Sequence, residues 1–280
     1  MEKTLKGLVP FCIIFVVFII VGFNYKLTIR SYDVKSNKLN KNVKLLLITD
    51  LHGVIYGDKQ SKLVNKIKEI NPDAILFAGD MFDEQISYDG TKQLFDGVAN
   101  EYDCYFVTGN HEYWTKEIDE IKNIVRGYGI TILEGNNSIL NVRGQNINIL
   151  GIDDPAGANS KSTNTTNRIN WLKQLEECGG EVVEGGYNIL LAHRPANIDK
   201  YKKYKFDLVL SGHSHGGQVR VPYLINGLYA PDEGCFPKYA GGHYEIDDIN
   251  LIVSRGLMTA GIIPRIYNPP ELVEVNLIPE

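Results

Sequence analysis

The sequence predicts an α/β fold in which polar side chains follow the ends of buried strands. Short apolar runs rich in β-branched residues alternate with segments of helical length, which is typical of βαβ units. Further apolar runs are separated only by the turn sequences GNN and RGQN, which is typical of antiparallel strands. In addition, five apolar runs each end on a residue that can bind a metal ion.

The chain begins with an apolar segment that predicts a membrane anchor. Residues 7–23 carry no charge and are rich in Ile, Val and Phe. A run of about 17 such residues is the lower limit for a helix that crosses a bilayer. The alternative is a cleaved signal peptide, but the following sequence GFNYKLTIR lacks the small-x-small pattern of a cleavage site. We therefore expect an uncleaved, single-pass anchor over residues 1–24 and one globular domain over residues 25–280.

The side of the membrane does not follow from the charges. More lysine and arginine residues follow the apolar segment than precede it. Applied literally, the positive-inside rule keeps the domain in the cytoplasm, yet large domains cross membranes largely regardless of charge. We favour an extracytoplasmic domain at the cell membrane and leave the side open.

The remaining elements follow in order along the chain. Residues 26–34 alternate polar and apolar side chains, which predicts a half-buried edge strand next to the membrane. The βαβ region comprises predicted strands and helices in alternation, over residues 43–49, 59–70, 74–77, 91–99, 105–108 and 116–126. Predicted strands over residues 130–133, 138–142 and 147–151 then form an antiparallel meander. Residues 158–167, ANSKSTNTTN, predict a polar loop, either a lid or a solvated connection into a helix over residues 169–177.

The residues at the run ends form a set of potential metal ligands. They are Asp50 and His52, Asp80, Asn110 and His111, His193, and His213 and His215. In open α/β sheets, ligands bind at the carboxyl-terminal rim of the strands. Two residues that stand two apart in extended backbone point to the same side, so Asp50 and His52 are expected to bind one cation together. Only one of the six histidines, His243, lies elsewhere.

This mixture of imidazole, carboxylate and amide groups indicates which metals fit. A set without thiolate suits manganese, iron or zinc better than calcium, which prefers oxygen alone, or a structural zinc, which usually recruits cysteine. Without His111, seven groups remain, which are too many for one tetrahedral ion. They suit two divalent cations that lie about 3.5–4 Å apart and share a carboxylate, with manganese favoured. Two cations at this distance stabilise the attacking and the leaving oxygen of a phosphoryl transfer.

The motifs resemble the complete series of the calcineurin-like metallophosphoesterases, in the family's order. They are Asp50-Leu51-His52, Gly79-Asp80, Gly109-Asn110-His111-Glu112, His193 and Gly212-His213-Ser214-His215. The match runs from about Val43 to the end of the chain. The C-terminal region, with SGHSHGGQVRVP and NPPEL, resembles a bacterial branch that is often membrane-anchored or exported. The resemblance implies a four-layer α/β/β/α sandwich.

The resemblance also implies roles for individual residues. The first metal is assigned to Asp50, His52, Asp80 and His215, and the second to Asp80, Asn110, His193 and His213. His111 is then the acid that protonates the leaving oxygen, oriented by Asp83, and the nucleophile is a hydroxide that bridges the two metals. Two alternatives stay open: Asp83 as a solvated turn residue, and Arg194 either binding a substrate phosphate or held in a local ion pair.

The sequence therefore predicts a membrane-anchored, dinuclear metal-dependent phosphoesterase. Phosphodiesters and pyrophosphates of membrane or cell-envelope compounds are the expected substrates, since some relatives hydrolyse a UDP-linked diacylated glucosamine. The alternative is a non-catalytic scaffold, which would be expected to have lost ligands or His111. A nucleic-acid substrate is disfavoured by the net charge of -5 and by the anchor. The sequence indicates no protein partner.

Overall fold

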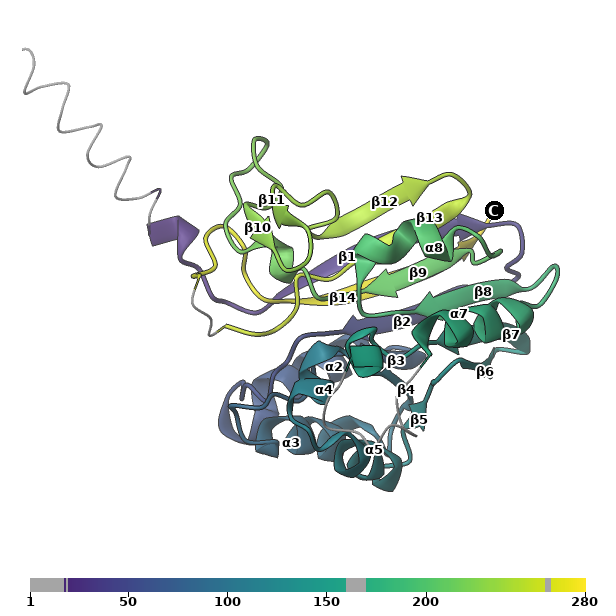
Figure 1. Ribbon diagram of the computed structural model, residues 1–280, viewed down its shortest axis with the longest axis horizontal. Helices are drawn as coiled ribbons and strands as arrows, with labels where there is room; N and C mark the ends of the chain where they lie inside the picture. The colour runs from purple at the N-terminus through teal and green to yellow at the C-terminus, as the bar shows by residue number, and fades with distance from the viewer. Residues whose placement is uncertain (1–17, 19, 160–169, 260–262) are drawn as a thin grey trace, which may run out of the picture.

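Two six-stranded sheets form the centre of the domain (Figure 1). The computed structural model describes residues 18, 20–159, 170–259 and 263–280. The first sheet has the order β1-β14-β2-β3-β4-β5. Its strands are β1 (Thr28–Ser36), β14 (Glu271–Pro279), β2 (Val43–Ile48), β3 (Ala74–Ala78), β4 (Asp103–Val107) and β5 (Thr131–Ile132). Strands β2 to β5 are parallel, which makes their carboxyl ends share one edge of the sheet.

The second sheet has the order β12-β13-β9-β8-β7-β6. Its strands are β12 (Gly242–Ile246), β13 (Ile249–Val253), β9 (Leu208–Ser211), β8 (Tyr187–Leu191), β7 (Gln145–Gly151) and β6 (Asn136–Val142). The four central strands are parallel, and β6 and β12 close the two edges as antiparallel hairpin partners. The second sheet therefore also has one edge where the parallel strands end.

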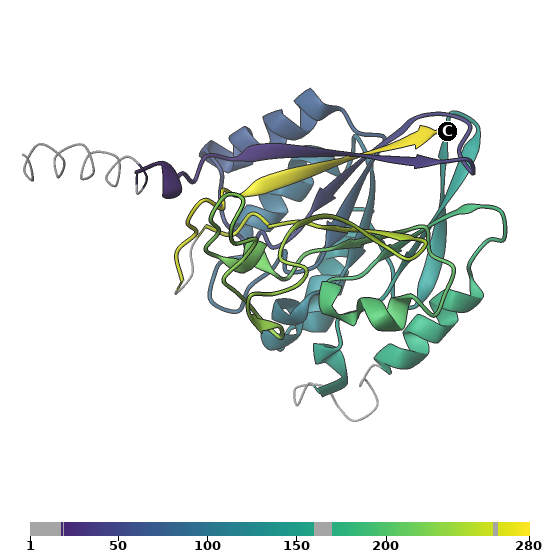
Figure 2. The same ribbon diagram turned by 90° about the horizontal axis from the view of Figure 1, so that it is seen from above.

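Helices cover the outer faces of both sheets (Figures 1 and 2). Apolar side chains of α2 (Ser61–Ile70), α3 (Asp89–Val98) and α5 (Ile118–Gly127) pack in one cluster with residues of β2, β3 and β4. Those of α7 (Trp171–Gly180) and α8 (Ile198–Tyr201) pack with β7, β8, β9 and β13. A third cluster, with Leu76 from β3 and Ile189 from β8, fills the space between the sheets. The α/β sandwich implied by the family resemblance is confirmed.

Short elements connect these layers. They are η1 (Asp58–Gln60), α4 (Asn110–Trp114), α6 (Ala156–Asn159), η3 (Pro195–Asn197), η4 (His215–Gly217), β10 (Tyr229–Ala230) and β11 (Gly234–Cys235). Helix α4 was not expected from the sequence, and it begins at Asn110, directly after β4.

The predicted three-stranded meander is wrong in its first strand. Residues 131–132 form β5, which pairs in parallel with β4 in the first sheet. The preceding helix α5 returns the chain beside β4, so this strand completes another βαβ unit. The chain then changes sheets at Gly135, which adopts φ +92° and donates its N–H to Gly151. Only β6 and β7 form the expected antiparallel hairpin.

The N-terminal region is described in part. The predicted edge strand is confirmed as β1, which pairs with β14 from Thr28↔Glu271 to Ser36↔Pro279. Residues 20–22 are helical, but residues 1–17 and 19 of the predicted anchor lie outside the described residues, as do residues 160–167 of the predicted polar loop. Within the described part of the chain, no helix combines the length and the apolar character needed to cross a membrane. The division at residues 24 and 25 stays a prediction.

Candidate metal centre

The predicted ligands follow the carboxyl ends of parallel strands in both sheets. Strand β2 ends two residues before Asp50, and β3 ends two residues before Asp80. Strand β8 ends two residues before His193, and β9 ends two residues before His213. The placement expected from the sequence is therefore confirmed. The sixth histidine, His243, lies on β12, where its Nε2 lies 2.8 Å from Oδ1 of Asn250.

The backbone around the ligands differs from the extended form that was expected. Five ligand residues have a left-handed φ: Asp50 (52°), His52 (49°), Asp80 (54°), His213 (67°) and His215 (46°). Such a conformation costs a non-glycine residue about 1–3 kcal/mol and tends to cluster at functional sites. Backbone hydrogen bonds hold it here, since His52 N donates to the carbonyl of Asp80 at 3.0 Å. The tight turns aim the side chains into the centre.

The first group of potential ligands is Asp50, His52, Asp80 and His215, all buried, whose ligand atoms lie within 4.8 Å of one another. His52 Nε2 is 3.8 Å from Asp80 Oδ2. His215 Nε2 is also 3.8 Å from an oxygen of Asp50. These distances are too long for hydrogen bonds, and a cation coordinated by both atoms would fit between them.

The second group is Asp80, His193 and His213. His193 Nε2 lies 3.1 Å from Asp80 Oδ2 and 3.2 Å from His213 Nδ1. Asp80 therefore belongs to both groups, which is the position predicted for the bridging carboxylate. Asn110 is buried at the start of α4, and the N–H of the next residue, His111, donates to Asp80 Oδ1 at 2.9 Å.

Unpaired buried atoms test whether this site fits metal ions. The 3.1 Å contact from His193 Nε2 lacks the geometry of a hydrogen bond, so Asp80 Oδ2, like His52 Nε2 and Asn110 Oδ1, has no hydrogen-bond partner among the described residues. Leaving a buried polar atom unpaired costs about 1–3 kcal/mol, and more for a charged group. All three atoms belong to predicted ligands and each has a lone pair to offer. The donor set therefore fits divalent cations.

In three of the predicted ligand histidines, the ring nitrogen that is not offered to the metal forms a hydrogen bond. Nδ1 of His52 donates to Asp83 Oδ2 at 2.7 Å, and Nδ1 of His193 donates to the carbonyl of Ala78 at 2.7 Å. Nε2 of His213 donates to Oδ2 of Asp232 at 3.0 Å. Each bond fixes the tautomer and leaves the other nitrogen free to coordinate, the usual arrangement around metal-binding histidines.

Charges in the centre favour the ligand-competent forms of Asp80 and His215, whereas nearby carboxylates, Asp80 first among them, raise the pKa of His193 to about 10. Burial alone would raise the pKa of Asp80, but the adjacent His193 holds it well below its usual range. Burial lowers the pKa of His215 to about 3, despite the opposing charge of Asp50. Asp80 is thus ionised and His215 neutral at pH 7, which are the states that bind cations.

Glycines leave room for the two ligand carboxylates. A Cβ atom on Gly109 would lie 2.1 Å from Oδ1 of Asp80. A Cβ atom on Gly212 would lie 2.6 Å from Oδ2 of Asp50, and one on Gly256, at φ +72°, would lie 2.5 Å from the Cβ of Asp50. No larger residue fits at these points without moving a ligand.

His111 belongs to neither of these two groups, but it forms a third group of potential ligands with His52 and Asp83. Its ring centroid is 4.4 Å from that of His52, and its side chain is 19% exposed. Nδ1 lies 2.8 Å from Oε2 of Glu84 and 3.2 Å from Oδ2 of Asp83. Burial alone would lower the pKa of His111, but these two carboxylates and Asp80 raise it to about 9. The imidazole is therefore held in its protonated form by the protein's own groups.

The contacts of Asp83 differ from the expected role. Asp83 was predicted to orient His111, but its Oδ2 lies closer to His52, at 2.7 Å. Its other oxygen accepts a hydrogen bond from the backbone of Gln85. Asp83 therefore contacts both a predicted ligand and the predicted acid, and Glu84, which the sequence did not single out, is the nearer carboxylate to His111.

The side chain of Glu112 connects the Gly79-Asp80 motif with its own motif, Gly109-Asn110-His111-Glu112. Its buried carboxylate accepts hydrogen bonds from four backbone N–H groups, those of Asp80, Met81, Phe82 and Gly109, at 2.7–3.0 Å. Burial and the charge of Asp80 raise the pKa of Glu112, and the hydrogen bonds from Phe82 and Gly109 oppose this effect. Because all four partners donate, the ionised form satisfies them best. Glu112 thereby fixes the turn that presents Asp80.

Arg194 is held in ion pairs. Its Nε and Nη2 donate to both oxygens of Asp154, at 2.7 and 2.9 Å, and its Nη1 contacts Oδ2 of Asp232. The same oxygen of Asp232 accepts from His213. Asp232 lies on the loop between β10 and β11, far in sequence from either partner, so no local motif singles it out. Of the two alternatives for Arg194, the structure shows the local ion pair.

A sequence profile of calcineurin-like phosphoesterases matches residues 43–217, more than half of the chain. The chain belongs to this family. The uncharacterized metallophosphoesterase YkoQ of Bacillus subtilis is 27% identical over 271 residues, which cover 91% of this chain and 95% of that protein. An uncharacterized metallophosphoesterase of Campylobacter jejuni is 29% identical over 259 residues, or 89% of this chain. This phosphoesterase spans 63% of the Campylobacter protein's length.

Solved structures agree on the fold. The NAD nucleotidase of Haemophilus influenzae matches 78% of this chain and 51% of its own, with a TM-score of 0.54 and 16% identity. At that identity the likeness concerns the fold alone. Family membership and the clustered side chains together identify this phosphoesterase as a metal-dependent phosphoric ester hydrolase with a dinuclear divalent metal site.

Proposed function

We propose that this phosphoesterase hydrolyses phosphodiester or pyrophosphate bonds in a membrane or cell-envelope compound. The observation that carries the proposal is the position of Asp80 between two groups of buried ligands, with the protonated His111 at their edge. A phosphodiester or pyrophosphate has a leaving oxygen that benefits from a proton, and an acid beside the metal centre supplies it.

The ligand roles in this proposal are those implied by the motifs. Asp50, His52 and His215 would hold one cation, and Asn110, His193 and His213 the other, with Asp80 shared between them. Two cations bound there would activate water and neutralise the charge on the substrate phosphate. Manganese is the proposed metal, with iron or zinc as alternatives, because the donors mix nitrogen and oxygen without thiolate.

The side chains around His111 support its role as the acid. Glu84 and Asp83 both accept from Nδ1, so the proton to be donated is the one on Nε2. Both carboxylates stabilise the charged imidazolium before transfer. The ring is partly exposed, so a substrate can reach it.

Trp114 supports an organic substrate larger than a simple phosphate. It lies one helical turn after His111, with the ring centroids 4.5 Å apart, and it is 52% exposed. An exposed indole beside a reacting centre offers a flat surface on which an aromatic or sugar ring can stack. The uridine of a UDP-linked diacylglucosamine-type lipid is one group of this kind, and we propose that class as a substrate.

Arg194 can bind a substrate phosphate only if the phosphate replaces one of its carboxylate partners. Its Nη1 is paired with Asp232, whose side chain is 46% exposed on a loop. A substrate phosphate would have to replace that carboxylate, while Asp154 continues to hold the other side of the guanidinium. We propose this exchange as the way in which Arg194 contacts substrate.

The proposed location is the cell membrane. An anchor over residues 1–24 would place the catalytic domain of residues 25–280 next to the bilayer, on the extracytoplasmic side. The uncharged run of residues 7–23 supports this placement, and protease treatment of intact cells tests it. Degradation of the domain is expected, and full protection would contradict the extracytoplasmic placement.

The activity is tested with the full chain purified in detergent, stripped of metal with EDTA and then supplied with manganese, iron or zinc. We expect manganese-dependent hydrolysis of bis-p-nitrophenyl phosphate and of a UDP-linked pyrophosphate. His111→Ala should slow turnover by about 10²–10⁴-fold, with the metal content unchanged. His243→Ala removes a histidine outside the clusters and serves as the matched control. Hydrolysis of p-nitrophenyl phosphate alone would contradict the proposed bond type, and no hydrolysis with any metal would favour the scaffold alternative.

A further inference from the structure

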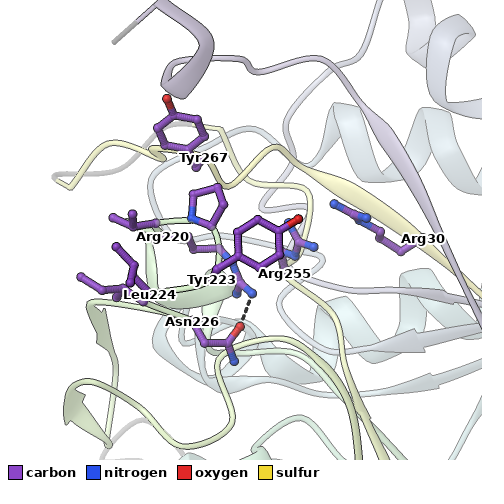
Figure 3. A pocket seen from close by; sticks show the side chains of 10 residues that line it. Arg30, Arg220, Tyr223, Leu224, Asn226, Arg255 and Tyr267 are labelled. Carbon is purple, nitrogen blue, oxygen red and sulfur yellow. Dashed lines mark hydrogen bonds between the residues drawn. The ribbon is translucent and has the colours of Figure 1, made fainter. Parts of the chain in front are cut away.

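A cavity of about 400 Å³ lies where the N-terminal segment meets the domain. Arginine and apolar side chains line it, principally Arg30, Arg220, Arg255, Tyr223, Leu224 and Tyr267. Figure 3 shows Tyr267 directly beside the short N-terminal helix, with Arg220 and Arg255 deeper and Arg30 on the neighbouring strand β1. None of the predicted metal ligands is among the described residues that line this cavity. It is a separate site.

The cavity carries an excess of positive charge. The buried carboxylate of Glu271 pairs with two of the arginines that line the cavity. Its Oε2 lies 3.1 Å from Nε of Arg255 and 4.0 Å from Nε of Arg30. Arg220 is different, because its partners among the described residues are neutral: the carbonyl of Gly216 at 3.2 Å and Oδ1 of Asn226. Three guanidinium groups thus face one carboxylate.

The excess of positive charge in the cavity is unfavourable unless an anion binds there. Burial and the neighbouring charge of Arg255 lower the pKa of Arg220 to about 10. Arginine stays charged at neutral pH even so, and its planar donors match the oxygens of a phosphate. A phosphate in the cavity would relieve the repulsion between the arginines.

The rim of the cavity is apolar and exposed. Tyr223 is fully exposed and Leu224 is 82% exposed, at the tip of a turn closed by the bridge between Val221 and Ile225. Apolar side chains this exposed are typical of surfaces that contact a membrane or another protein.

The N-terminal segment extends this apolar surface. The ring of Tyr267 lies 4.7 Å from that of Phe18, and its hydroxyl donates to the carbonyl of Phe18. Side chains just beyond this contact, including Ile20, Val21 and Phe23, are also exposed. Apolar groups and arginines therefore lie together at the end of the domain next to residues 20–23, and a lipid surface matches both kinds of group.

We propose that Arg30, Arg220 and Arg255 bind the phosphate of an anionic phospholipid headgroup, with Tyr223 and Leu224 inserted among the lipid chains. The site orients the catalytic domain on the bilayer, and a single apolar helix could not do this alone because it leaves the domain free to rotate. The inference does not depend on which phosphoester the metal centre hydrolyses.

Native mass spectrometry of the full chain in mild detergent tests the site. The protein is titrated with phosphatidylglycerol, with phosphatidylcholine and with glycerol 3-phosphate. We expect one phosphatidylglycerol to bind at least about 10-fold more tightly than either of the other two, since a charge-assisted hydrogen bond contributes about 1.5–3 kcal/mol. Arg220→Gln should abolish the preference, and Arg143→Gln, which alters an exposed arginine paired with Asp73, should keep it.

Further outcomes separate the alternatives. Arg220→Gln should leave hydrolysis of bis-p-nitrophenyl phosphate unchanged, which distinguishes this site from the metal centre. Should Arg220→Gln fail to fold, the double substitution of the exposed Tyr223 and Leu224 by Ser should reduce lipid binding and leave glycerol 3-phosphate binding intact. Equal binding of both lipids would overturn the proposal, as would an unchanged preference in folded Arg220→Gln. Glycerol 3-phosphate binding as tightly as phosphatidylglycerol would show a soluble phosphate ligand instead.

Discussion

Oδ2 of Asp83 lies 2.7 Å from Nδ1 of His52. The same oxygen lies 3.2 Å from Nδ1 of His111, so one carboxylate connects a proposed metal ligand with the proposed acid. Glu84, by contrast, contacts only His111 of these two. A change at Glu84 should therefore affect the acid alone, whereas a change at Asp83 should affect metal binding as well.

Asp83→Asn should weaken metal binding. The amide cannot replace the charged acceptor that holds Nδ1 of His52, and loss of such a partner typically lowers metal affinity about 10–100-fold. Equilibrium dialysis against manganese, followed by elemental analysis, measures this change. Unchanged affinity together with slower turnover would show that Asp83 acts on His111 alone.

Glu84→Gln should alter the pH profile and leave the metal content unchanged. Glu84 contributes to the raised pKa of His111, so its loss lowers that pKa, and the acid then loses its proton at lower pH. The alkaline limb of kcat should shift to lower pH relative to the wild type. Glu69→Gln, an exposed glutamate on α2, is the matched control. An unshifted limb would remove Glu84 from the proposed mechanism.

Glu112→Gln should destabilise the protein. The carboxylate accepts from four backbone N–H groups, and a Gln side chain would direct its NH₂ group toward two of these donors. We expect a loss of about 2–4 kcal/mol in the free energy of unfolding, measured in urea. Glu177→Gln, on the exposed face of α7, should change it by less than about 0.5 kcal/mol. Equal effects would show that Glu112 does not anchor the turn.

Trp114→Ala should raise KM for bis-p-nitrophenyl phosphate about 3- to 10-fold with little change in kcat, because a stacking contact contributes about 0.5–1.5 kcal/mol. Trp114→Phe should restore most of the loss. A lower kcat at unchanged KM would indicate that the indole positions His111 instead.

Strands β2, β3 and β4 and the clustering of Asp50, His52, Asp80 and His215 could be predicted from the sequence because they depend on local patterns. Strand β3 is a run of buried residues that ends just before Gly79 and Asp80, and parallel pairing brings such ends together. The left-handed φ of Asp50 and His52 could not be predicted, since neither residue type requires it. Contacts between the strands and the surrounding turns impose it.

Contacts between distant parts of the chain explain the other differences. Strand β14 lies between β1 and β2, with Val275 opposite Leu45, and no local pattern specifies a partner so far away. Asp232 reaches His213 and Arg194 from a loop that has no motif. The parallel pairing of β5 depends on how α5 returns the chain, which the spacing of the strands does not reveal.

Asp80 is proposed to bridge two cations, and anomalous diffraction can locate both of them. Crystals of the full chain grown with manganese are measured at the manganese absorption edge. We expect two peaks about 3.5–4 Å apart, both in contact with Asp80, one beside His52 and His215 and the other beside His193 and His213. A single peak, or two peaks of which only one contacts Asp80, would contradict it.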